Sequence, residues 1–277
     1  MEFSGERLIP EIGGKAAYEH LARYAYASSF TTNKCVLDIA CGEGYGSFLL
    51  SKNSKKIVGV DLNEEVIKHA SSKYKSNNLS FFAASIFNLP FEDGYFDLII
   101  CVETIEHVMD QKSAISELKR VLKPGGLLFI STPEKDVYNK DGLGNLSHYH
   151  EKELTSTEFI DLISIFFKRI EVLKQIHIDG SLIYSDLGNI SIHNYVSGGF
   201  DEFILKDVES EFNLIIASNN ELPEFASSFL YRDYELIKTE IDYLSKIKVN
   251  KVLSGFRYRV INFLFKPIDY FKSLFSK

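Results

Sequence analysis

The sequence predicts an α/β protein built on a mostly parallel sheet with helices wound over both faces. The first observation is a loop in which Gly42, Gly44 and Gly46 alternate between an apolar strand and an apolar helix. The second is an acidic residue, Asp61, at the end of the next strand. The third is the repeated alternation of strand and helix patterns across residues 35–132, which is typical of doubly wound sheets. Together they indicate a nucleotide site, because glycines let the backbone approach a ligand and a carboxylate can bind ribose hydroxyls.

The predicted elements follow one another in a regular order. A helical lead-in is expected over residues 1–33, because apolar residues such as Tyr18, Leu21 and Ala22 recur there at helical spacing. After it we expect strand 35–40, helix 46–52, strand 56–60, helix 63–74, strands 79–83 and 96–102, helix 113–122 and strand 127–132. A helix over 156–166 and strands near 169–176 and 213–218 complete the pattern. Asn63 is the predicted N-cap of helix 63–74. A Pro-Gly-Gly run at 124–126 is expected to end helix 113–122.

The chain divides into one domain and a tail. We expect residues 1–220 to form the domain, with residues 177–212 as an irregular insertion, and residues 221–277 to form a helical tail. Residues 246–277 hold eight Lys and Arg against a single acid, Asp269, and aromatic residues lie between them. Such a tail is expected either to lie on a membrane surface or to pack on protein, including self-association with a second copy.

Composition narrows the class of protein. The 277 residues are 45% hydrophobic and 25% charged, which is typical of a globular protein. A net charge of −7 argues against a nucleic-acid partner, because phosphate binding needs a basic face. Cys35, Cys41 and Cys101 have no disulfide or zinc spacing, so we expect free thiols. The N-terminus has no apolar leader, and we expect a cytoplasmic protein, membrane-peripheral if the tail binds lipid.

The spacing of the glycines indicates which nucleotide binds. The dinucleotide fingerprint is G-x-G-x-x-G and holds a pyrophosphate, whereas this loop has the spacing G-x-G-x-G. Asp38 lies inside the preceding strand and Glu43 within the loop. Negative charge there suits a cationic ligand with an amine and no phosphate, which describes S-adenosylmethionine better than NAD.

The order of motifs along the chain resembles that of the class I S-adenosylmethionine-dependent methyltransferases. The motifs are Val36-Leu37-Asp38-Ile39-Ala40-Cys41-Gly42-Glu43-Gly44-Tyr45-Gly46, Val58-Gly59-Val60-Asp61, Leu89-Pro90-Phe91 and Leu122-Lys123-Pro124-Gly125-Gly126. Within this class the chain looks most like enzymes of sugar and surface-glycan biosynthesis, on Gly5-Glu6-Arg7, Glu19-His20-Leu21-Ala22-Arg23-Tyr24, Glu103-Thr104-Ile105-Glu106-His107-Val108, Ser131-Thr132-Pro133 and His148-Tyr149-His150-Glu151. The resemblance covers residues 1–175 and implies a seven-stranded sheet.

The resemblance also implies where the cofactor binds. The loop residues Ala40, Gly42 and Gly44 would lie along its methionine half, with Arg23 on the methionine carboxylate. Asp61 would bind the ribose, and Leu62 and Ile86 would enclose the adenine. Ser85 stands where the family often has an acid for the adenine amino group, and Glu103 would orient the cofactor. Asp38 either orients the loop or binds the cofactor's ammonium group.

Two polar clusters are candidates for the chemical step. Glu103, Glu106 and His107 follow the fourth strand and could transfer a proton, bind Mg²⁺ or Mn²⁺, or simply orient the loop and cofactor. A similar Glu-x-x-Glu-His run occurs in the ubiquinone-pathway O-methyltransferases. His148 is the other candidate base, and its neighbours His150 and Asn145 are predicted to bind the substrate.

The resulting functional prediction is O-methylation of a sugar hydroxyl on a nucleotide-sugar or surface glycan. Such a hydroxyl is a weak nucleophile and needs a base, for which His148 and His107 are the candidates. Two alternatives stay open. One is a small-molecule acceptor of quinone or lipid type, and the other is a catalytically silent cofactor-binding scaffold that recruits glycan enzymes through its tail.

Overall fold

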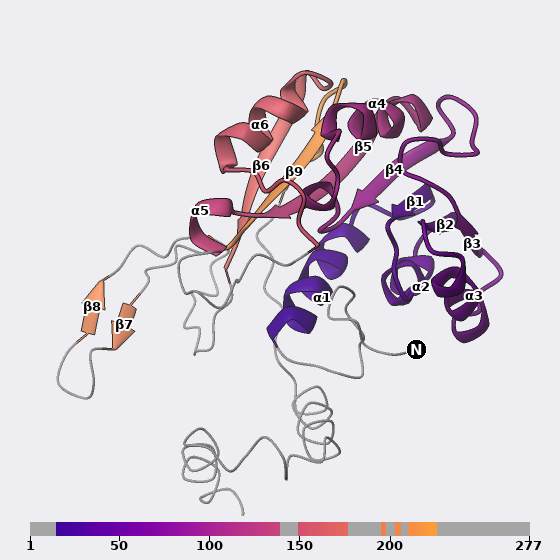
Figure 1. Ribbon diagram of the computed structural model, residues 1–277, viewed down its shortest axis with the longest axis horizontal. Coiled ribbons are helices and arrows are strands. Elements are labelled where there is room, and N and C mark those ends of the chain that lie inside the picture. Colours follow the sequence, from indigo (N-terminus) through magenta and orange to yellow (C-terminus); the bar gives the residue numbers. More distant parts are fainter. Residues whose placement is uncertain (1–14, 139–148, 177–194, 198–202, 206–209, 226–277) are drawn as a thin grey trace, which may run out of the picture.

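The computed structural model describes residues 15–138, 149–176, 195–197, 203–205 and 210–225. A seven-stranded sheet in the order β3-β2-β1-β4-β5-β9-β6 forms its centre (Figure 1). The strands are β1 (Cys35–Ile39), β2 (Lys56–Asp61), β3 (Leu79–Ala83), β4 (Phe96–Cys101), β5 (Leu122–Pro133), β6 (Arg169–Gln175) and β9 (Phe212–Ser218). The first five run parallel, and β9 is antiparallel to both β5 and β6. The predicted α/β fold with a seven-stranded sheet is confirmed.

Helices cover both faces of this sheet (Figure 1). They are α1 (Lys15–Ser28), α2 (Tyr45–Ser51), α3 (Glu64–Lys73), α4 (Gln111–Val121), α5 (Lys135–Tyr138) and α6 (Ser156–Ser164), with a short 3₁₀ turn, η2 (Ile105–His107). Side-chain caps fix where several of them begin. Asn63 accepts from the N–H groups of Glu65 and Val66, as predicted, and Thr155 with Glu158 forms a capping box at α6.

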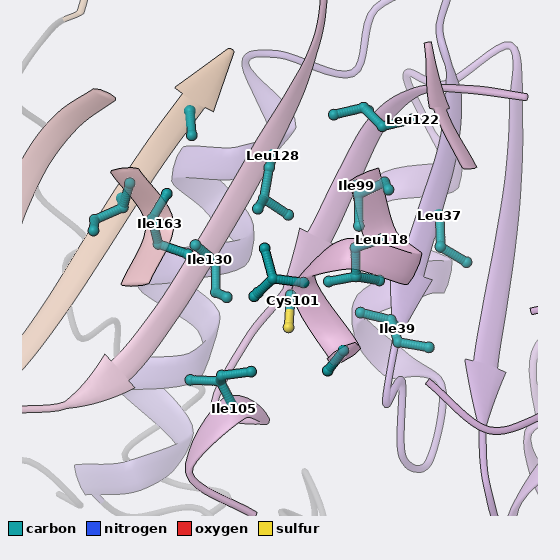
Figure 2. Packing of buried hydrophobic residues seen from close by; sticks show 14 of the residues in the cluster. Leu37, Ile39, Ile99, Cys101, Ile105, Leu118, Leu122, Leu128, Ile130 and Ile163 are labelled. Atoms are coloured by element: carbon teal, nitrogen blue, oxygen red, sulfur yellow. The ribbon is translucent and has the colours of Figure 1, made fainter. Parts of the chain in front are cut away.

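Alternation along the buried strands creates two hydrophobic cores. On β1, Val36 packs with α1 and α2 on one face, while Leu37 packs with α4 and α6 on the other. On β4, Ile99 and Cys101 face the α4–α6 core, which Figure 2 shows from close by. Because successive strand residues point to opposite faces, strands buried on both sides must be apolar throughout.

Several parts of the chain differ from the prediction or lie outside the described residues. Of the lead-in predicted to be helical over residues 1–33, α1 covers Lys15–Ser28, and residues 1–14 lie outside the described residues. β5 begins at Leu122 rather than 127, because Leu122 already pairs with Phe96 of β4. The insertion predicted to be irregular contains an antiparallel pair, β7 (Tyr195–Ser197) and β8 (Phe203–Leu205). The tail over residues 226–277 lies outside the described residues, so the division at residue 220 and the role of the tail stay predictions. None of the helices that the structure describes is long and apolar enough to cross a membrane.

Helix α1 is fixed to the nucleotide loop through one aromatic side chain. The ring of Tyr24 lies over Gly46, where an added Cβ would meet its Cζ at 2.1 Å. The Tyr24 hydroxyl donates to Asp38 Oδ1 at 3.1 Å, and Ser47 of α2 donates to Oδ2 at 2.5 Å. The lead-in helix, the first strand and the loop helix therefore meet at one buried carboxylate.

This contact predicts the sign of a helix substitution. Helix propensity alone makes Gly46→Ala stabilising by about 1 kcal/mol, whereas the clash with Tyr24 should make it destabilising by about 1–3 kcal/mol. Urea unfolding measures the free energy in the single variants and in a Tyr24→Ala background. With the ring removed, Gly46→Ala should become neutral or stabilising. A stabilising effect in the wild-type background would contradict the packing.

Candidate active site

A cavity of about 630 Å³ opens at the carboxyl ends of β1, β2 and β4. The strand order reverses between β1 and β4, and open α/β sheets bind their ligands at such a point. Two non-glycine residues that line the cavity have positive φ angles: Ala40 after β1, at 54°, and Glu103 after β4, at 45°. Non-glycine residues held in this region are strained, and such strain concentrates at functional sites.

The three loop glycines have different roles. Gly42 has φ +53° and lines the cavity, and a Cβ built on it would have nothing within 4 Å. Gly44 does not belong to the lining, because it packs inward, where a Cβ would lie 2.8 Å from both Ala70 and Phe81. Gly42 therefore faces the cavity, and Gly44 allows the loop to close onto α3 and β3. The contact predicted between Gly44 and the cofactor stays a prediction.

Asp61 links the nucleotide loop to the cavity. It is 6% exposed and lines the cavity. Its Oδ2 accepts from the backbone N–H of Gly42 at 3.1 Å, and its Oδ1 accepts from that of Asn63 at 3.0 Å. These two bonds orient the carboxylate beside the loop, and its contact with the ribose hydroxyls stays a prediction.

The predicted adenine residues border the same cavity. Leu62 is 74% exposed, and Ile86 and Phe87 lie on the lining with it. Ser85 also lines the cavity, and its Oγ accepts from the N–H of Phe87 at 3.2 Å. Its hydroxyl oxygen has a second acceptor site, so an adenine amino group is chemically compatible, and this contact stays a prediction.

Asp38 lies behind the cavity wall. It is fully buried and lies outside the lining, so of its two predicted roles the geometry supports orientation of the loop. It does so by accepting from two hydroxyls, those of Tyr24 and Ser47, rather than from backbone N–H groups. Burial raises the pKa of Asp38 from 3.8 to about 7, and the bonds from Ser47 and Tyr24 oppose that rise.

Negative charge in the loop is partly neutralised. Glu43 is buried, and its carboxylate contacts Lys73, the His69 Nε2 at 3.2 Å and the Tyr74 hydroxyl at 3.3 Å. We inferred a cationic ligand from the negative charges of Glu43 and Asp38. Because Lys73 compensates the charge of Glu43, that inference is weakened. Glu43 ties the loop to α3 instead.

Arg23 reaches the cavity through Glu103. Its guanidinium is 1% exposed, lies over the Phe212 ring at 4.2 Å and donates from Nε to Gln175 at 2.7 Å. Nη1 lies 3.7 Å from Glu103 Oε1, which also accepts from Ser131 Oγ at 2.6 Å. Glu103 lines the cavity and Arg23 does not. Arg23 therefore serves as the partner of Glu103, and its predicted bond to the methionine carboxylate stays a prediction.

The polar cluster after β4 differs from the predicted one. Glu106, His107 and His150 each place one ligand atom within 4.8 Å of the others, and Glu103 is not part of this group. The rings of His107 and His150 lie 4.9 Å apart. His107 lines the cavity, whereas Glu106 lies behind it. Burial, and then the nearby Glu103, raise the pKa of Glu106 well above 4.5. His148 and Asn145 lie outside the described residues.

His20 and Tyr45 are among the cavity-lining residues that sequence reasoning missed. The Tyr45 hydroxyl lies 3.2 Å from His20 Nδ1. Burial, with the nearby Arg23, lowers the pKa of His20 to about 3, so its ring is neutral at physiological pH. Both residues stood inside quoted motifs, but only the packing of α1 against the loop brings them together.

Comparison with known proteins defines the class. Residues 37–130 match the methyltransferase domain family. The strand order and the cavity described above agree with this match, so the region is similar to methyltransferase domains in both sequence and architecture.

Individual relatives agree with that class. A protein of Mycolicibacterium smegmatis named a probable S-adenosylmethionine-dependent methyltransferase is 28% identical over 165 residues, 59% of this chain and 63% of its own length. A ubiquinone biosynthesis O-methyltransferase of Coxiella burnetii is 37% identical over 101 residues, 36% of this chain and 43% of its own length. The chain thus spans less than two thirds of the length of these relatives.

Solved structures show the same fold. An S-adenosylmethionine-dependent methyltransferase from Thermotoga maritima has a TM-score of 0.53 at 21% identity, over 73% of this chain and 89% of its own. One from Archaeoglobus fulgidus has a TM-score of 0.53 at 17% identity, over 73% of this chain and 92% of its own.

The ribose assignment predicts a loss of affinity. Asp61→Ala should weaken binding of S-adenosylhomocysteine by about 1–3 kcal/mol, roughly ten- to a hundredfold, because hydroxyls and the Gly42 N–H lose their acceptor. Calorimetric titration measures it. The control ligand is an analogue without ribose hydroxyls. It should bind the wild type weakly, and its affinity should fall little further in Asp61→Ala. Equal losses for both ligands would contradict the ribose contact.

The buried Asp38 predicts a pH dependence of stability. Between about pH 4 and pH 7 the folded protein keeps a proton on Asp38 that the unfolded chain has released. The free energy of unfolding should therefore fall as pH rises through this window. Asp38→Asn removes the titration, so its melting temperature should fall less than that of the wild type in calorimetric scans from pH ~4.5 to ~7.5. Parallel curves would show that Asp38 is ionised throughout.

Proposed function

We propose that this protein transfers the methyl group of S-adenosylmethionine to a hydroxyl of a small-molecule or glycan acceptor. The observation that carries the proposal is one cavity with two chemically different ends. Gly42 and Asp61 lie at the end that suits a nucleoside, and His107 lies at the other. Bound S-adenosylmethionine supplies an activated methyl group, and the chain must hold the acceptor in line with it and away from water.

His107 is the residue we propose to activate the acceptor hydroxyl. Its Nδ1 lies 2.8 Å from the carbonyl oxygen of Tyr149. A carbonyl can only accept, so Nδ1 carries the hydrogen and Nε2 of the neutral ring carries a lone pair. The ring is thus fixed in the tautomer that can interact with a hydroxyl proton at the cavity wall.

The acceptor proposed from the motifs is a sugar hydroxyl. Two acidic residues on the lining, Asp110 after β4 and Glu151 after β5, suit hydrogen bonds to such a polyol. His150 contacts this end through His107, which supports the predicted role of His150 in substrate binding.

A second acceptor class is favoured by an apolar side chain near His107. Met109, two residues after His107, lines the cavity and is 66% exposed. A quinone, phenol or lipid-like ring bound at this end would cover it. The Coxiella burnetii relative is named for ubiquinone biosynthesis, and an Aspergillus nomiae relative, 29% identical over 159 residues, is named an O-methyltransferase.

The function is tested by turnover of S-adenosylmethionine with a panel of nucleotide-sugars, glycans, catechols and demethylated quinones. With the acceptor that is methylated, His107→Gln should lower kcat by ~10²–10⁴ while affinity for S-adenosylhomocysteine is unchanged. His69→Gln changes a histidine that does not line the cavity, and as the matched control it should keep the wild-type kcat. Cofactor binding without turnover on any acceptor would favour the silent scaffold, and full activity of His107→Gln would remove His107 from the chemical step.

A further inference from the structure

We propose that Glu106, His107 and His150 bind a first-row transition-metal ion at the acceptor end of the cavity. The inference rests on the proposed function for its purpose, but metal binding itself can be measured without an acceptor. Within the described part of the chain, these residues form the only group of His, Cys, Asp and Glu whose ligand atoms all lie within 4.8 Å of one another. The set replaces the predicted Glu103, Glu106 and His107.

The backbone holds the two contributing segments together. Glu106 and His107 belong to the turn η2, and His150 comes from a segment more than forty residues further along the chain. The carbonyl oxygen of Glu106 accepts from the N–H groups of Glu151 at 2.9 Å and Lys152 at 3.0 Å. The proximity of His150 to η2 is therefore fixed by two backbone hydrogen bonds rather than by the side chains alone.

Both imidazoles are oriented as metal ligands are. His107 donates from Nδ1 to the Tyr149 carbonyl at 2.8 Å, and His150 Nδ1 lies 2.7 Å from Glu153 Oε1. Metal-bound histidines commonly donate their other ring N–H to a carbonyl or carboxylate, which fixes the tautomer and makes the ring more basic. Here the Nδ1 atom of His107 is supported by a carbonyl and that of His150 by a carboxylate, which leaves Nε2 of each ring as the atom that can bind a metal ion.

Glu106 supplies an independent observation that points to a cation. The residue is 1% exposed, and its Oε2 accepts from Thr132 Oγ1 at 3.1 Å, whereas its Oε1 has no hydrogen-bond partner among the described residues. Burying a carboxylate oxygen without a partner is costly. A cation between Glu106 and the two imidazoles would compensate that charge, and the ligand group already includes this carboxylate.

The ligand types select the ion. Mg²⁺ prefers oxygen ligands, and the predicted set with two carboxylates would have suited it. However, Glu103 is engaged by Ser131 and Arg23. Two imidazoles and one carboxylate suit Zn²⁺, Mn²⁺, Fe²⁺ or Co²⁺. The ligand atoms would close by roughly 1 Å around an ion, since Zn–N and Zn–O bonds are about 2.0–2.2 Å long.

An ion at this position would refine how His107 acts. Three protein ligands leave coordination positions for water or an acceptor hydroxyl, because His107 itself borders the cavity. A metal ion lowers the pKa of an oxygen that it binds. His107 Nε2 would then hold the ion instead of taking the proton, and the acceptor hydroxyl would lose its proton to solvent or to a neighbouring acid such as Glu151.

Direct metal titration tests the site. The full chain, stripped with chelator, is titrated calorimetrically with Zn²⁺, Mn²⁺ and Mg²⁺, and with Co²⁺ while visible absorption is recorded. We expect each chain to bind one transition-metal ion, with a higher affinity than it has for Mg²⁺. Glu153→Gln removes the carboxylate that supports His150 and should lower the metal affinity about 10–100-fold. His150→Ala removes the ligand itself and should lower the metal affinity further. Glu103→Gln is the matched control and should keep the wild-type metal affinity.

Three results would overturn the proposal: no transition-metal binding by the stripped wild type, unchanged affinity in His150→Ala, or loss of the ion in Glu103→Gln alone. Thermal unfolding and S-adenosylhomocysteine affinity show whether each variant is folded. Full methyl transfer by metal-free enzyme would overturn the role proposed for the ion in activating the acceptor and leave the proposed function intact. Tight metal binding without turnover on any acceptor would support the site and count against the proposed function.

Discussion

The buried carboxylate of Asp38 is the interaction on which the rest of the site depends. It sits at the end of β1 and accepts hydrogen bonds from Tyr24 on α1 and Ser47 on α2. A carboxylate so deeply buried is favourable only when it is hydrogen-bonded, so the three elements must arrive together. The Tyr24 ring that makes one of these bonds also covers Gly46. The lead-in helix thereby becomes one wall of the cavity rather than an appendage.

The loop above this carboxylate is then held from several sides at once. Asp61 binds the Gly42 N–H from β2, and Lys73 contacts Glu43 from α3. A loop that is already fixed by its neighbours loses little conformational freedom when a nucleoside binds, and this favours affinity. The same logic applies at the other end of the cavity, where backbone bonds from residues 151 and 152 fix η2. At both ends, hydrogen bonds and ion pairs within the protein hold the segments that line the cavity.

Several predicted site residues turned out to support others. Arg23 contacts Glu103, Gly44 packs against α3 and β3, and Glu106 lies behind His107. The position of a residue in a motif at the end of a strand indicates that it lies near the site. It does not determine which way the side chain points, because that depends on packing against segments distant in the sequence. His20 and Tyr45 illustrate the converse, since helix packing alone brings them to the lining.

The sequence by itself determined the fold class, the order of the first five strands, the cap at Asn63 and the place of the nucleotide loop. These features follow from local periodicity and turn chemistry, which a single chain displays directly. Only the tertiary structure decided that β5 starts at Leu122, that β7 and β8 pair, and that His150 rather than Glu103 joins Glu106 and His107. Those outcomes depend on contacts between residues far apart in the chain, and no local pattern records such contacts.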